Sequence, residues 1–301
     1  MSWRDTAQPI LRFAPSPSGR LHLGHAFSAL FTWSEAERLG GDVLLRIEDI
    51  DHTRCKPEHI ANLKADLTWL GLRWADDEVR HQSQHMADYT AMLAQLQTMG
   101  LVYPCFCTRA EIKAEIERSV SAPHGPEGPL YPGTCRNLDH REAAQRILDG
   151  ESHAWRLDLA KALARIPDRT RLNWFDEGVG PVTGQPEQLG DVVLARKDIA
   201  TSYHLAVVHD DALQGITHVT RGKDLFHATH LHVLLQALLD FPTPVYHHHD
   251  LITDDQGQRL ATRDKAKSLA HLRDEGLTAQ DVLDQLRGTL PCLDERQGTV
   301  G

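Results

Sequence analysis

The sequence predicts an α/β protein built on a parallel sheet, and three observations support that fold class. An apolar segment, a turn, an amphipathic helix and a second apolar segment follow one another over residues 8–51, which is the order of a βαβ unit. Further amphipathic helices and apolar strand patterns follow along the chain. The 301 residues, 41% hydrophobic and 25% charged, are enough for one large domain or two smaller ones with a sizeable core.

The first unit opens with "QPILRFAPSPSG", residues 8–19, which is typical of a short strand followed by a turn. A helix is predicted over about Leu21–Leu39, because apolar residues recur there at helical spacing. Gly40 and Gly41 are expected to end it. Residues 42–51, "DVLLRIEDID", are then predicted to form a buried strand with acidic residues at its carboxyl end.

Two more amphipathic helices are predicted within residues 57–74 and 86–103. The composition changes after that, since residues 104–150 are rich in cysteine, proline and glycine. This indicates an insertion with its own stabilising device. Residues 153–160 and 191–198 are expected to be strands of the insertion or of the return from it.

The last part of the chain resumes an apolar strand pattern in "SYHLAVVHDDAL", residues 202–213, and in "GITHVTRGKDL", residues 215–225. A helix is predicted over residues 225–239. The final fifty residues are expected to hold a strand, a loop and short helices.

Charge and hydropathy limit the partners and the compartment. The formal net charge of −10 argues against broad, non-specific nucleic-acid binding, although a local basic patch on an acidic body stays possible. No stretch approaches 18 consecutive apolar residues, and the N-terminus lacks a basic region followed by an apolar one. We therefore expect a cytoplasmic protein with no membrane partner.

Two histidines begin the first predicted helix. His22 and His25 are three residues apart and therefore share a helix face at its first turn, where the free N–H groups and the helix dipole attract anions. Gly24 between them allows a flat ring to approach the backbone. These features favour a binding site for nucleotide phosphates at the carboxyl edge of the sheet. The alternative is a pair of surface histidines at a helix start.

Four segments carry a family resemblance over some 220 residues. "HLGH" after "APSPSG" resembles the HIGH signature of class I aminoacyl-tRNA synthetases, in the form used by glutamyl-tRNA synthetases. "LLRIEDIDHTR", "SYHLAVVHDD" and "VTRGKDL" resemble that family's R-I-E-D-T-D, Y-x-L-A-V-V-x-D-D and V-x-R-G-x-D-L segments, in the same order.

The resemblance implies a Rossmann-like class I catalytic domain with an inserted, zinc-containing, acceptor-type subdomain. We expect residues 1–103 and 191–250 to form the two halves of the catalytic domain, with the insertion at 104–190. Residues 251–301 would hold a degenerate form of the family's lysine-bearing loop and a short helical C-terminal segment.

A glutamate substrate needs cations for its two carboxylates and an acid for its ammonium group. Arg12 and Arg221 can each make bidentate contacts to a carboxylate, and Glu48 can take the ammonium group. Tyr203 and Ser16 offer hydroxyl groups. All five match the family's glutamate-binding positions, so the resemblance implies those roles here. The alternative for an arginine is a surface ion pair, and for Glu48 it is a buried partner of Arg46 or Arg54.

The reaction implied by the resemblance is adenylation. The glutamate α-carboxylate attacks the α-phosphorus of ATP, pyrophosphate leaves, and Mg²⁺ accompanies the ATP. Catalysis would rest on positioning and on stabilising charge at the phosphates, which are roles that we assign to His22, Gly24 and His25 at the helix start.

The family's second signature, K-[ML]-S-K, aligns with "RLATR", residues 259–263, and departs from it. Arg259 replaces the first lysine, Leu260 follows, and Thr262 stands where the pyrophosphate-contacting lysine is expected. We place Leu260 and Thr262 against ATP and assign charge stabilisation to Arg259 and Arg263, with Lys265 and Lys267 as further candidates for the missing cation.

Three of the five cysteines lie close together in the sequence. Cys105, Cys107 and Cys135 supply three sulfurs, and one more donor completes a tetrahedral Zn²⁺ site. Tyr131 as the fourth ligand follows the pattern of one subfamily, and His124 or His140 is the conventional alternative. The site would be structural, while three buried free cysteines are the other interpretation.

A run of three adjacent histidines in "YHHHDL", residues 246–251, does not predict a metal site. Neighbours on a strand alternate between its faces, so the three rings cannot converge on one ion. We expect one of them to lie beside the adenine pocket, as in the family, and the others to lie on the surface.

The chain stops soon after the second signature, since only residues 264–301 follow it. A glutamyl-tRNA synthetase continues into a large anticodon-binding region. A truncated member with this cysteine pattern resembles the subfamily that activates L-glutamate without tRNA and transfers it to the queuosine base of tRNA(Asp). The partner implied is the anticodon stem-loop of that tRNA, bound by a monomer.

Three other functions are compatible with parts of this sequence. They are a short glutamyl-tRNA synthetase that charges the tRNA 3′ end, a catalytically impaired paralogue that binds glutamate or tRNA, and a small-molecule nucleotidyltransferase of the same fold. Thr262 supports the impaired paralogue. The intact "HLGH", Arg12, Glu48 and Arg221 oppose it.

Overall fold

The computed structural model describes residues 8–75, 79–118, 124–125, 128–252 and 267–287. Its largest sheet has seven strands in the order β3-β2-β1-β11-β12-β8-β9 within those residues. All neighbours are parallel except β8 and β9. The strands are β1 (Ile10–Phe13), β2 (Asp42–Ile47), β3 (Arg80–His81), β8 (Trp174–Asp176), β9 (Gly180–Val182), β11 (His218–Gly222) and β12 (Val245–His249). The predicted α/β class with a parallel sheet is confirmed.

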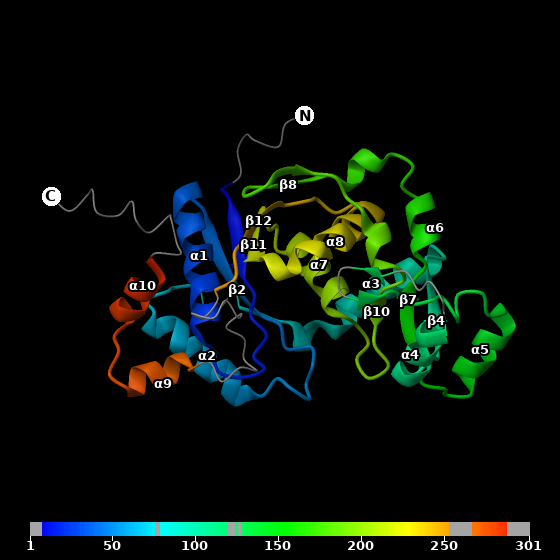
Figure 1. Cartoon of the computed structure of the whole chain (residues 1–301), viewed down its shortest axis with the longest axis horizontal. Helices are drawn as coiled ribbons and strands as arrows, with labels where there is room; N and C mark the ends of the chain where they lie inside the picture. The colour runs from blue at the N-terminus through cyan, green and yellow to red at the C-terminus, as the bar shows by residue number, and fades with distance from the viewer. Residues whose placement is uncertain (1–7, 76–78, 119–123, 126–127, 253–266, 288–301) are drawn as a thin grey trace.

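Helices cover both faces of this sheet, as Figure 1 shows. On one side pack α1 (Leu23–Leu39), α2 (Pro57–Trp69), α9 (Leu269–Asp274) and α10 (Ala279–Arg287) around one apolar cluster. On the other pack α3 (Met86–Thr98), α6 (Leu159–Ala164), α7 (Tyr203–Leu213) and α8 (Phe226–Leu238) around a second cluster. A parallel sheet with helices on both faces buries its strands completely, which explains their near-continuous apolar runs.

The first βαβ unit follows the sequence closely. Helix α1 begins at Leu23 rather than near Leu21, because His22 has extended backbone and serves as the N-cap. Gly40 ends the helix with φ of 64°, a left-handed conformation that glycine adopts without a steric penalty. Strand β1 pairs with β2 on one side and with β11 on the other. The strand order therefore reverses beside β1, and ligands bind parallel α/β sheets at the carboxyl side of such a point.

The segment 202–213, expected to be a strand, is the helix α7, so that expectation was wrong. Ser202 caps the helix by accepting a hydrogen bond from the Leu205 amide at 3.5 Å. Its apolar run is buried between α3, α8 and β10 (Val193–Ala195). A short, continuous apolar run is compatible with a buried strand or a buried helix, and only the packing distinguishes them.

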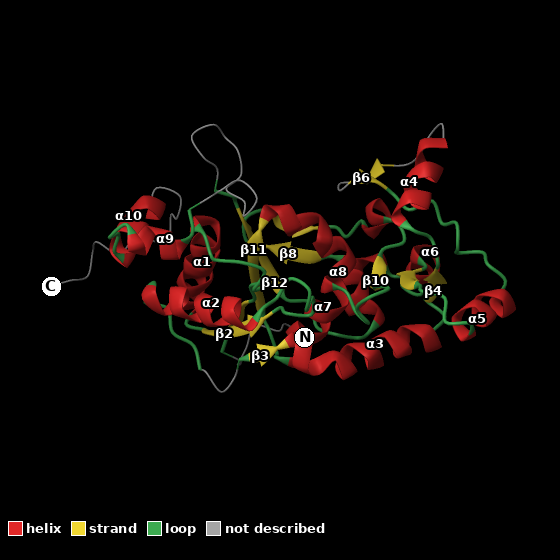
Figure 2. Cartoon of the chain, turned by 90° about the horizontal axis from the view of Figure 1, so that it is seen from below, coloured by secondary structure: helices red, strands yellow, loops and turns green. Residues whose placement is uncertain are grey.

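A smaller antiparallel sheet, in the order β10-β7-β4, lies at the opposite end of the molecule from α9 and α10 (Figure 2). Its other strands are β4 (Val102–Cys105) and β7 (Ala154–Leu157). The helices α4 (Arg109–Arg118) and α5 (His140–Leu148) and the short hairpin of β5 (His124–Gly125) and β6 (Gly128–Pro129) lie in the same part of the chain. Single-turn 3₁₀ helices occupy Gln82–His85, Arg169–Leu172, Pro186–Leu189 and Lys223–Leu225.

The strand pairing does not follow the expected boundaries of the insertion. Strands β4 and β10 lie partly or wholly outside residues 104–190, yet they complete the small sheet. Strands β8 and β9 lie inside 104–190, yet they extend the large one. Composition marks where the insertion becomes rich in loops, but hydrogen bonding between strands decides which sheet each segment joins.

Candidate active site

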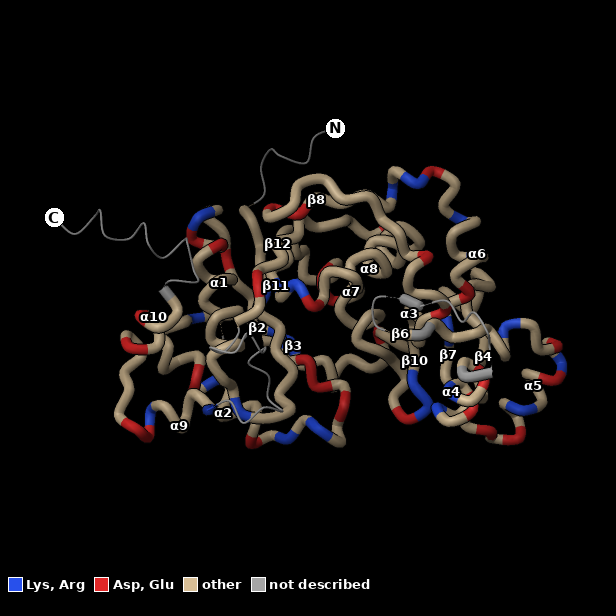
Figure 3. Tube along the Cα trace, in the orientation of Figure 1, with Lys and Arg blue, Asp and Glu red and all other residues tan. Residues whose placement is uncertain are grey.

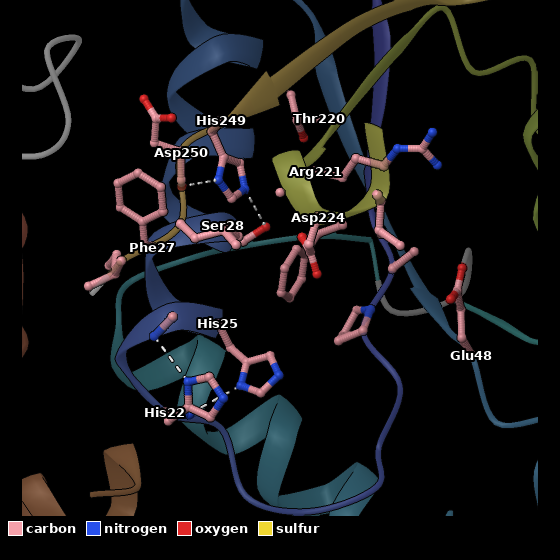
Figure 4. A pocket seen from close by; sticks show the side chains of 18 of the residues that line it. His22, His25, Phe27, Ser28, Glu48, Thr220, Arg221, Asp224, His249 and Asp250 are labelled. Atoms are coloured by element: carbon pink, nitrogen blue, oxygen red, sulfur yellow. Dashed lines mark hydrogen bonds between the residues drawn. The ribbon is translucent and has the colours of Figure 1, made fainter. Parts of the chain in front are cut away.

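Two adjoining cavities open at the carboxyl ends of β1, β2 and β11. The first has a volume of about 300 Å³. Figure 4 shows His22 and His25 at one side of it and Arg221 and Glu48 at the other. Seven of the predicted site residues line it: Arg12, His22, Gly24, His25, Glu48, Tyr203 and Arg221. The strand order thus gathers residues that are up to 209 positions apart, from Arg12 to Arg221.

Arg12 is held by a carboxylate that sequence analysis did not single out. Its Nε donates to Oδ1 of Asp211 at 3.1 Å, and its Nη1 donates to the Thr220 carbonyl at 3.1 Å. The same Asp211 oxygen accepts from Arg46 Nη1 at 2.8 Å. One buried carboxylate is therefore shared between two buried guanidinium groups.

Glu48 follows the last residue of β2, and its amide donates to the Pro15 carbonyl at 3.1 Å. Its Oε1 accepts from Arg46 Nη2 at 3.4 Å. Burial raises the pKa of Glu48, and the charges of Arg46 and Arg12 oppose that rise. Glu48 thus has the buried arginine partner that was considered for it, and it also faces the cavity.

Arg221 has no carboxylate partner within ion-pair distance among the described residues. Its Nε donates to His248 Nε2 at 3.0 Å, and its Nη1 donates to His232 Nδ1 at 3.1 Å. Thr229 Oγ1 and Tyr203 Oη accept from its two Nη atoms. The side of the cavity formed by these groups therefore contains a buried cation, 5% exposed, that is surrounded by neutral acceptors.

The groups nearest this side of the cavity carry one positive charge in excess, and the next carboxylate, on Asp176, is separated from Arg221 by His248. Three guanidinium groups, on Arg12, Arg46 and Arg221, face the two carboxylates of Glu48 and Asp211. A buried charge without a partner is costly in free energy, so the arrangement favours an anionic ligand. L-Glutamate, with one ammonium and two carboxylate groups, carries that one negative charge.

The two histidines at the start of α1 have defined tautomers. The Gly24 amide donates to His22 Nδ1 at 3.1 Å, and the His22 amide donates to His25 Nδ1 at 3.3 Å. Each Nδ1 is therefore an acceptor, and each neutral ring carries its hydrogen on Nε2. The ring centroids are 3.9 Å apart. The expected shared orientation is confirmed, with His22 as the cap rather than a residue of the first turn.

Gly222 ends β11 beside the same cavity, and its role is to leave space. A Cβ at this position would lie 2.5 Å from Oδ1 of Asp224 and 2.8 Å from Cδ2 of Leu251. A larger residue at Gly222 would therefore have to displace the ends of the Asp224 and Leu251 side chains, while the φ of −68° at this position is open to any residue.

The three consecutive histidines of β12 alternate between two faces, as expected. His247 and His249 both pack against Phe31, and His249 Nε2 lies 3.1 Å from Ser28 Oγ in the first cavity. His248 points the other way, and its Nδ1 lies 2.6 Å from Asp176 Oδ2. The expectation of surface positions was wrong for His248, which is 2% exposed because Phe226 and Thr229 of α8 pack against its ring on that face of the sheet.

The second cavity, of about 630 Å³, adjoins the first, and Glu48 and Tyr203 line both. Ser16, expected in the glutamate site, lines this second cavity instead of the first. Its other walls come from both sheets and include Asp51, Arg54, Tyr131, Arg156, Asp191, Arg196 and His204.

The predicted lysine-replacing loop lies outside the described residues. This applies to Arg259, Leu260, Thr262 and Arg263, and also to Lys265. Lys267 is described, and its Nζ lies 2.6 Å from Oε1 of Glu275. The described flank at Ser268 forms a bridge with His22, and the Leu269 amide donates to the Leu21 carbonyl at 2.8 Å.

The cysteines and the tyrosine of the insertion converge. The Sγ atoms of Cys105, Cys107 and Cys135 lie within 4.8 Å of one another. Tyr131 Oη lies 3.3 Å from Cys105 Sγ and 3.6 Å from Cys107 Sγ. Three sulfurs and one phenol oxygen in this arrangement match the donor number of a tetrahedral zinc site. His140 is exposed, and the His124 side chain lies outside the described part.

Several residues of the site were not found by sequence reasoning. The two pocket arginines are held by Asp211, His232 and His248, and Asp176 acts through His248. These four residues lie in apolar or histidine-rich segments that have no motif of their own. The acidic pair in "VVHDDAL" was the one available hint.

Basic and acidic positions are mixed along both ends of the molecule in the view of Figure 3. None of the helices in the described ranges has the length and apolar character that a bilayer crossing requires.

Comparisons with known proteins agree on one family. The profile of class I tRNA synthetases (E and Q), catalytic domain, matches residues 10–289. The glutamyl-Q tRNA(Asp) synthetase of Rhodobacter capsulatus is 48% identical over 91% of this chain and 98% of its own length. That of Symbiobacterium thermophilum is 43% identical over 91% of this chain and 84% of its own.

Two solved structures resemble the fold. A glutamate tRNA ligase from Elizabethkingia meningosepticum, in complex with its amino acid, has a TM-score of 0.74 and 26% identity. Glutamate-tRNA synthetase from Elizabethkingia anophelis has a TM-score of 0.76 and 26% identity. Each match covers 93% of this chain, which spans 60% of the first structure and 61% of the second.

Proposed function

Since this chain belongs to the class I tRNA synthetases of the glutamate and glutamine group, and is thus a ligase-type enzyme, we propose that it adenylates L-glutamate without tRNA and transfers the glutamyl group to queuosine in tRNA(Asp). The observation that carries the first half is Arg221, a buried guanidinium without a carboxylate partner in the described structure, in one cavity with Arg12 and Glu48. The relatives named glutamyl-Q tRNA(Asp) synthetase support the second half.

The first cavity selects an amino acid with two carboxylates. Arg12 and Arg221 supply one guanidinium group for each carboxylate, and Glu48 accepts the ammonium group. Glutamine lacks the second negative charge. It would therefore leave the excess positive charge of the pocket without a partner, which is costly in a buried site.

Adenylation joins a glutamate α-carboxylate oxygen to the α-phosphorus of ATP, and the bond to the departing pyrophosphate breaks. His22 and His25 each hold an Nε2–H donor at the N-terminus of α1, where the helix dipole also favours negative charge. These groups bind and orient the phosphates and stabilise the charge that develops on them. Mg²⁺ enters with ATP and neutralises part of the phosphate charge.

Transfer breaks the bond between the glutamyl carbonyl carbon and AMP. A hydroxyl oxygen of the queuosine diol forms the new ester bond and loses its proton. We place the acceptor nucleoside in the second cavity, because that cavity meets the first at Glu48 and Tyr203. The anticodon stem-loop would then lie across the opening of this cavity.

We further propose that Cys105, Cys107, Tyr131 and Cys135 hold a structural Zn²⁺ ion. Their side chains converge without forming a large apolar core of their own, which is the usual situation of small segments stabilised by metal. The ion would tie β4 to the loop that contains Tyr131 and Cys135.

Two assays test the function. Pyrophosphate exchange should depend on L-glutamate, without tRNA, and should not occur with glutamine or aspartate. Labelled glutamate should then appear on queuosine-containing tRNA(Asp) from which the 3′-terminal adenosine has been removed. Label on intact tRNA alone, regardless of queuosine, would establish charging of the 3′ end instead. Absence of both exchange and label would contradict the proposal.

A further inference from the structure

Arg221 and two imidazoles, on His232 and His204, form a hydrogen-bonded chain that reaches from the first cavity to the second. Arg221 Nη1 lies 3.1 Å from His232 Nδ1, and His232 Nε2 lies 3.1 Å from His204 Nδ1. His204 lines the second cavity, whereas Arg221 lines the first. On another side of Arg221, His248 connects its Nε to Asp176.

The direction of every hydrogen bond in this chain follows from the arginine. A guanidinium group has donors and no acceptors, so His232 Nδ1 must accept. A neutral His232 then carries its hydrogen on Nε2 and donates it to Nδ1 of His204. The hydrogen of His204 is left on Nε2 by the same logic.

Neither His232 nor His204 can take a second proton without losing a hydrogen bond. These two rings form one arm of the network around Arg221. Burial and then the nearby Arg221 charge lower the pKa of His232 well below its usual value. The same two causes lower the pKa of His204 to about 4. Both rings are therefore neutral at physiological pH, and their tautomers are determined by their neighbours.

The second arm differs because it ends on an anion. His248 Nε2 accepts from Arg221, so its Nδ1–H donates to the Asp176 carboxylate. That arm is closed and serves to position the guanidinium group. The arm through His232 ends at the Nε2–H of His204, for which no acceptor is found among the described residues.

We infer that His204 presents an oriented N–H donor to the second cavity, where it recognises an uncharged oxygen of the acceptor nucleoside, either a hydroxyl or a carbonyl group. The placement of a nucleoside in this cavity rests on the proposed function. The orientation of the donor rests on Arg221 and His232 and does not depend on it. His204 is thus a specificity residue for the acceptor.

Substitutions at His204 test the role. His204→Leu removes the donor, and we expect KM for the tRNA to rise about tenfold, as for one lost hydrogen bond, and by more than KM for glutamate. His204→Gln keeps one acceptor for His232 and one donor for the cavity, and it should restore most of the affinity. His227→Leu, at an exposed ring on α8 outside both cavities, is the matched control and should change neither constant.

Two outcomes would overturn the inference. One is an unchanged KM for tRNA in His204→Leu, and the other is an equal loss in glutamate-dependent pyrophosphate exchange, which would mark His204 as support for Arg221 alone. If the wild-type protein showed no transfer to tRNA, the proposed function would fail separately. Nitrogen-15 NMR of the histidine rings would then test the inferred tautomer of His204 by itself, because a hydrogen on its Nδ1 would contradict the inferred hydrogen-bond directions.

Discussion

At the scale of single residues, both arginines of the first cavity are oriented by neighbours from distant parts of the chain. Asp211 of α7 holds Arg12 of β1, and the histidines of α8 and β12 hold Arg221 of β11. Side chains fixed in this way lose little conformational entropy when a ligand binds, which favours tight and selective binding. The two arginines nevertheless differ, because Arg12 shares a carboxylate and Arg221 does not.

Arg221→Ala should raise KM for glutamate steeply. Removing a buried guanidinium group that pairs with a substrate carboxylate costs about 2–5 kcal/mol, so we expect a fall of at least 30-fold in kcat/KM for glutamate. Arg221→Lys should recover part of this loss. The measurement is pyrophosphate exchange at varied glutamate concentration. Arg141→Ala, on α5 and outside both cavities, is the control, and an unchanged glutamate dependence in Arg221→Ala would contradict the assignment.

His25→Ala should lower the rate of exchange with a smaller effect on glutamate affinity. The substitution removes an Nε2–H donor near the phosphates, and a donor that acts on the transition state contributes on the order of 100-fold to kcat. His85→Ala, which removes a half-buried histidine outside both cavities, is the comparison. An exchange rate equal to that of the unaltered protein would exclude His25 from the phosphate site.

At the scale of elements, helix α1 contacts both the start of α9 and strand β12. Its N-cap, His22, forms a bridge with Ser268, the N-cap of α9. Its fourth turn contacts β12 through Glu35, whose Oε2 lies 3.2 Å from His247 Nδ1 and 2.7 Å from Arg38 Nη2. Helix α1 therefore connects the histidine signature to the strand that carries His248 and His249.

Glu35 should make stability depend on pH in the acid range. Burial by itself would raise the pKa of this carboxyl group, but hydrogen bonds from His247 and Arg38 outweigh it and lower the pKa to about 2. The unfolded chain then binds a proton near pH 4.5 while the folded chain does not, so stability present above about pH 4.5 is lost as the pH falls towards 2.

The contribution is about 3 kcal/mol at neutral pH. Denaturant unfolding at pH 7 and at acid pH should show a smaller pH dependence for Glu35→Gln than for the unaltered protein. Glu37→Gln, an exposed position on the same helix, is the matched control. An identical pH dependence in Glu35→Gln and the unaltered protein would show that Glu35 does not have a lowered pKa.

At the scale of the whole molecule, the two sheets contribute residues to different cavities. The large sheet carries every predicted residue of the first cavity on its strand ends or on helices α1 and α7. The small sheet lies at the other end (Figure 1) and contributes Arg156 and Val193 to the second cavity, with Tyr131 beside them. Tyr131 belongs to both the cysteine cluster and the second cavity, so the proposed metal site also supports the acceptor site.

Removal of the metal should therefore affect the two half-reactions unequally. Cys107→Ala should lower the zinc content measured by elemental analysis from one ion per chain to a small fraction. It should also speed amide hydrogen exchange in β4 and β7. Transfer to tRNA should fall more than glutamate-dependent pyrophosphate exchange. Cys55→Ala, at a cysteine outside the cluster, should leave the zinc content unchanged. Full zinc content in Cys107→Ala would rule out that ligand set.

The sequence by itself determined the family, the first βαβ unit and the grouping of cysteines in the insertion. These depend on short patterns, such as the spacing of His22 and His25, the glycines after α1 and the separation of Cys105 from Cys135, whose physical effect is local. Arg12, Glu48 and Arg221 were predicted in the same way, because each lies in or beside a recognisable motif.

Only the tertiary structure decided how those residues are held. The apolar run of α7 is compatible with a strand until its packing against α3 and α8 is known. The partners of Arg221 come from β12, α7 and α8, and Asp176 of β8, which holds His248, is 72 positions from it. Such contacts depend on which strands are neighbours in the sheet, and strand order is a property of the folded chain that no short segment contains.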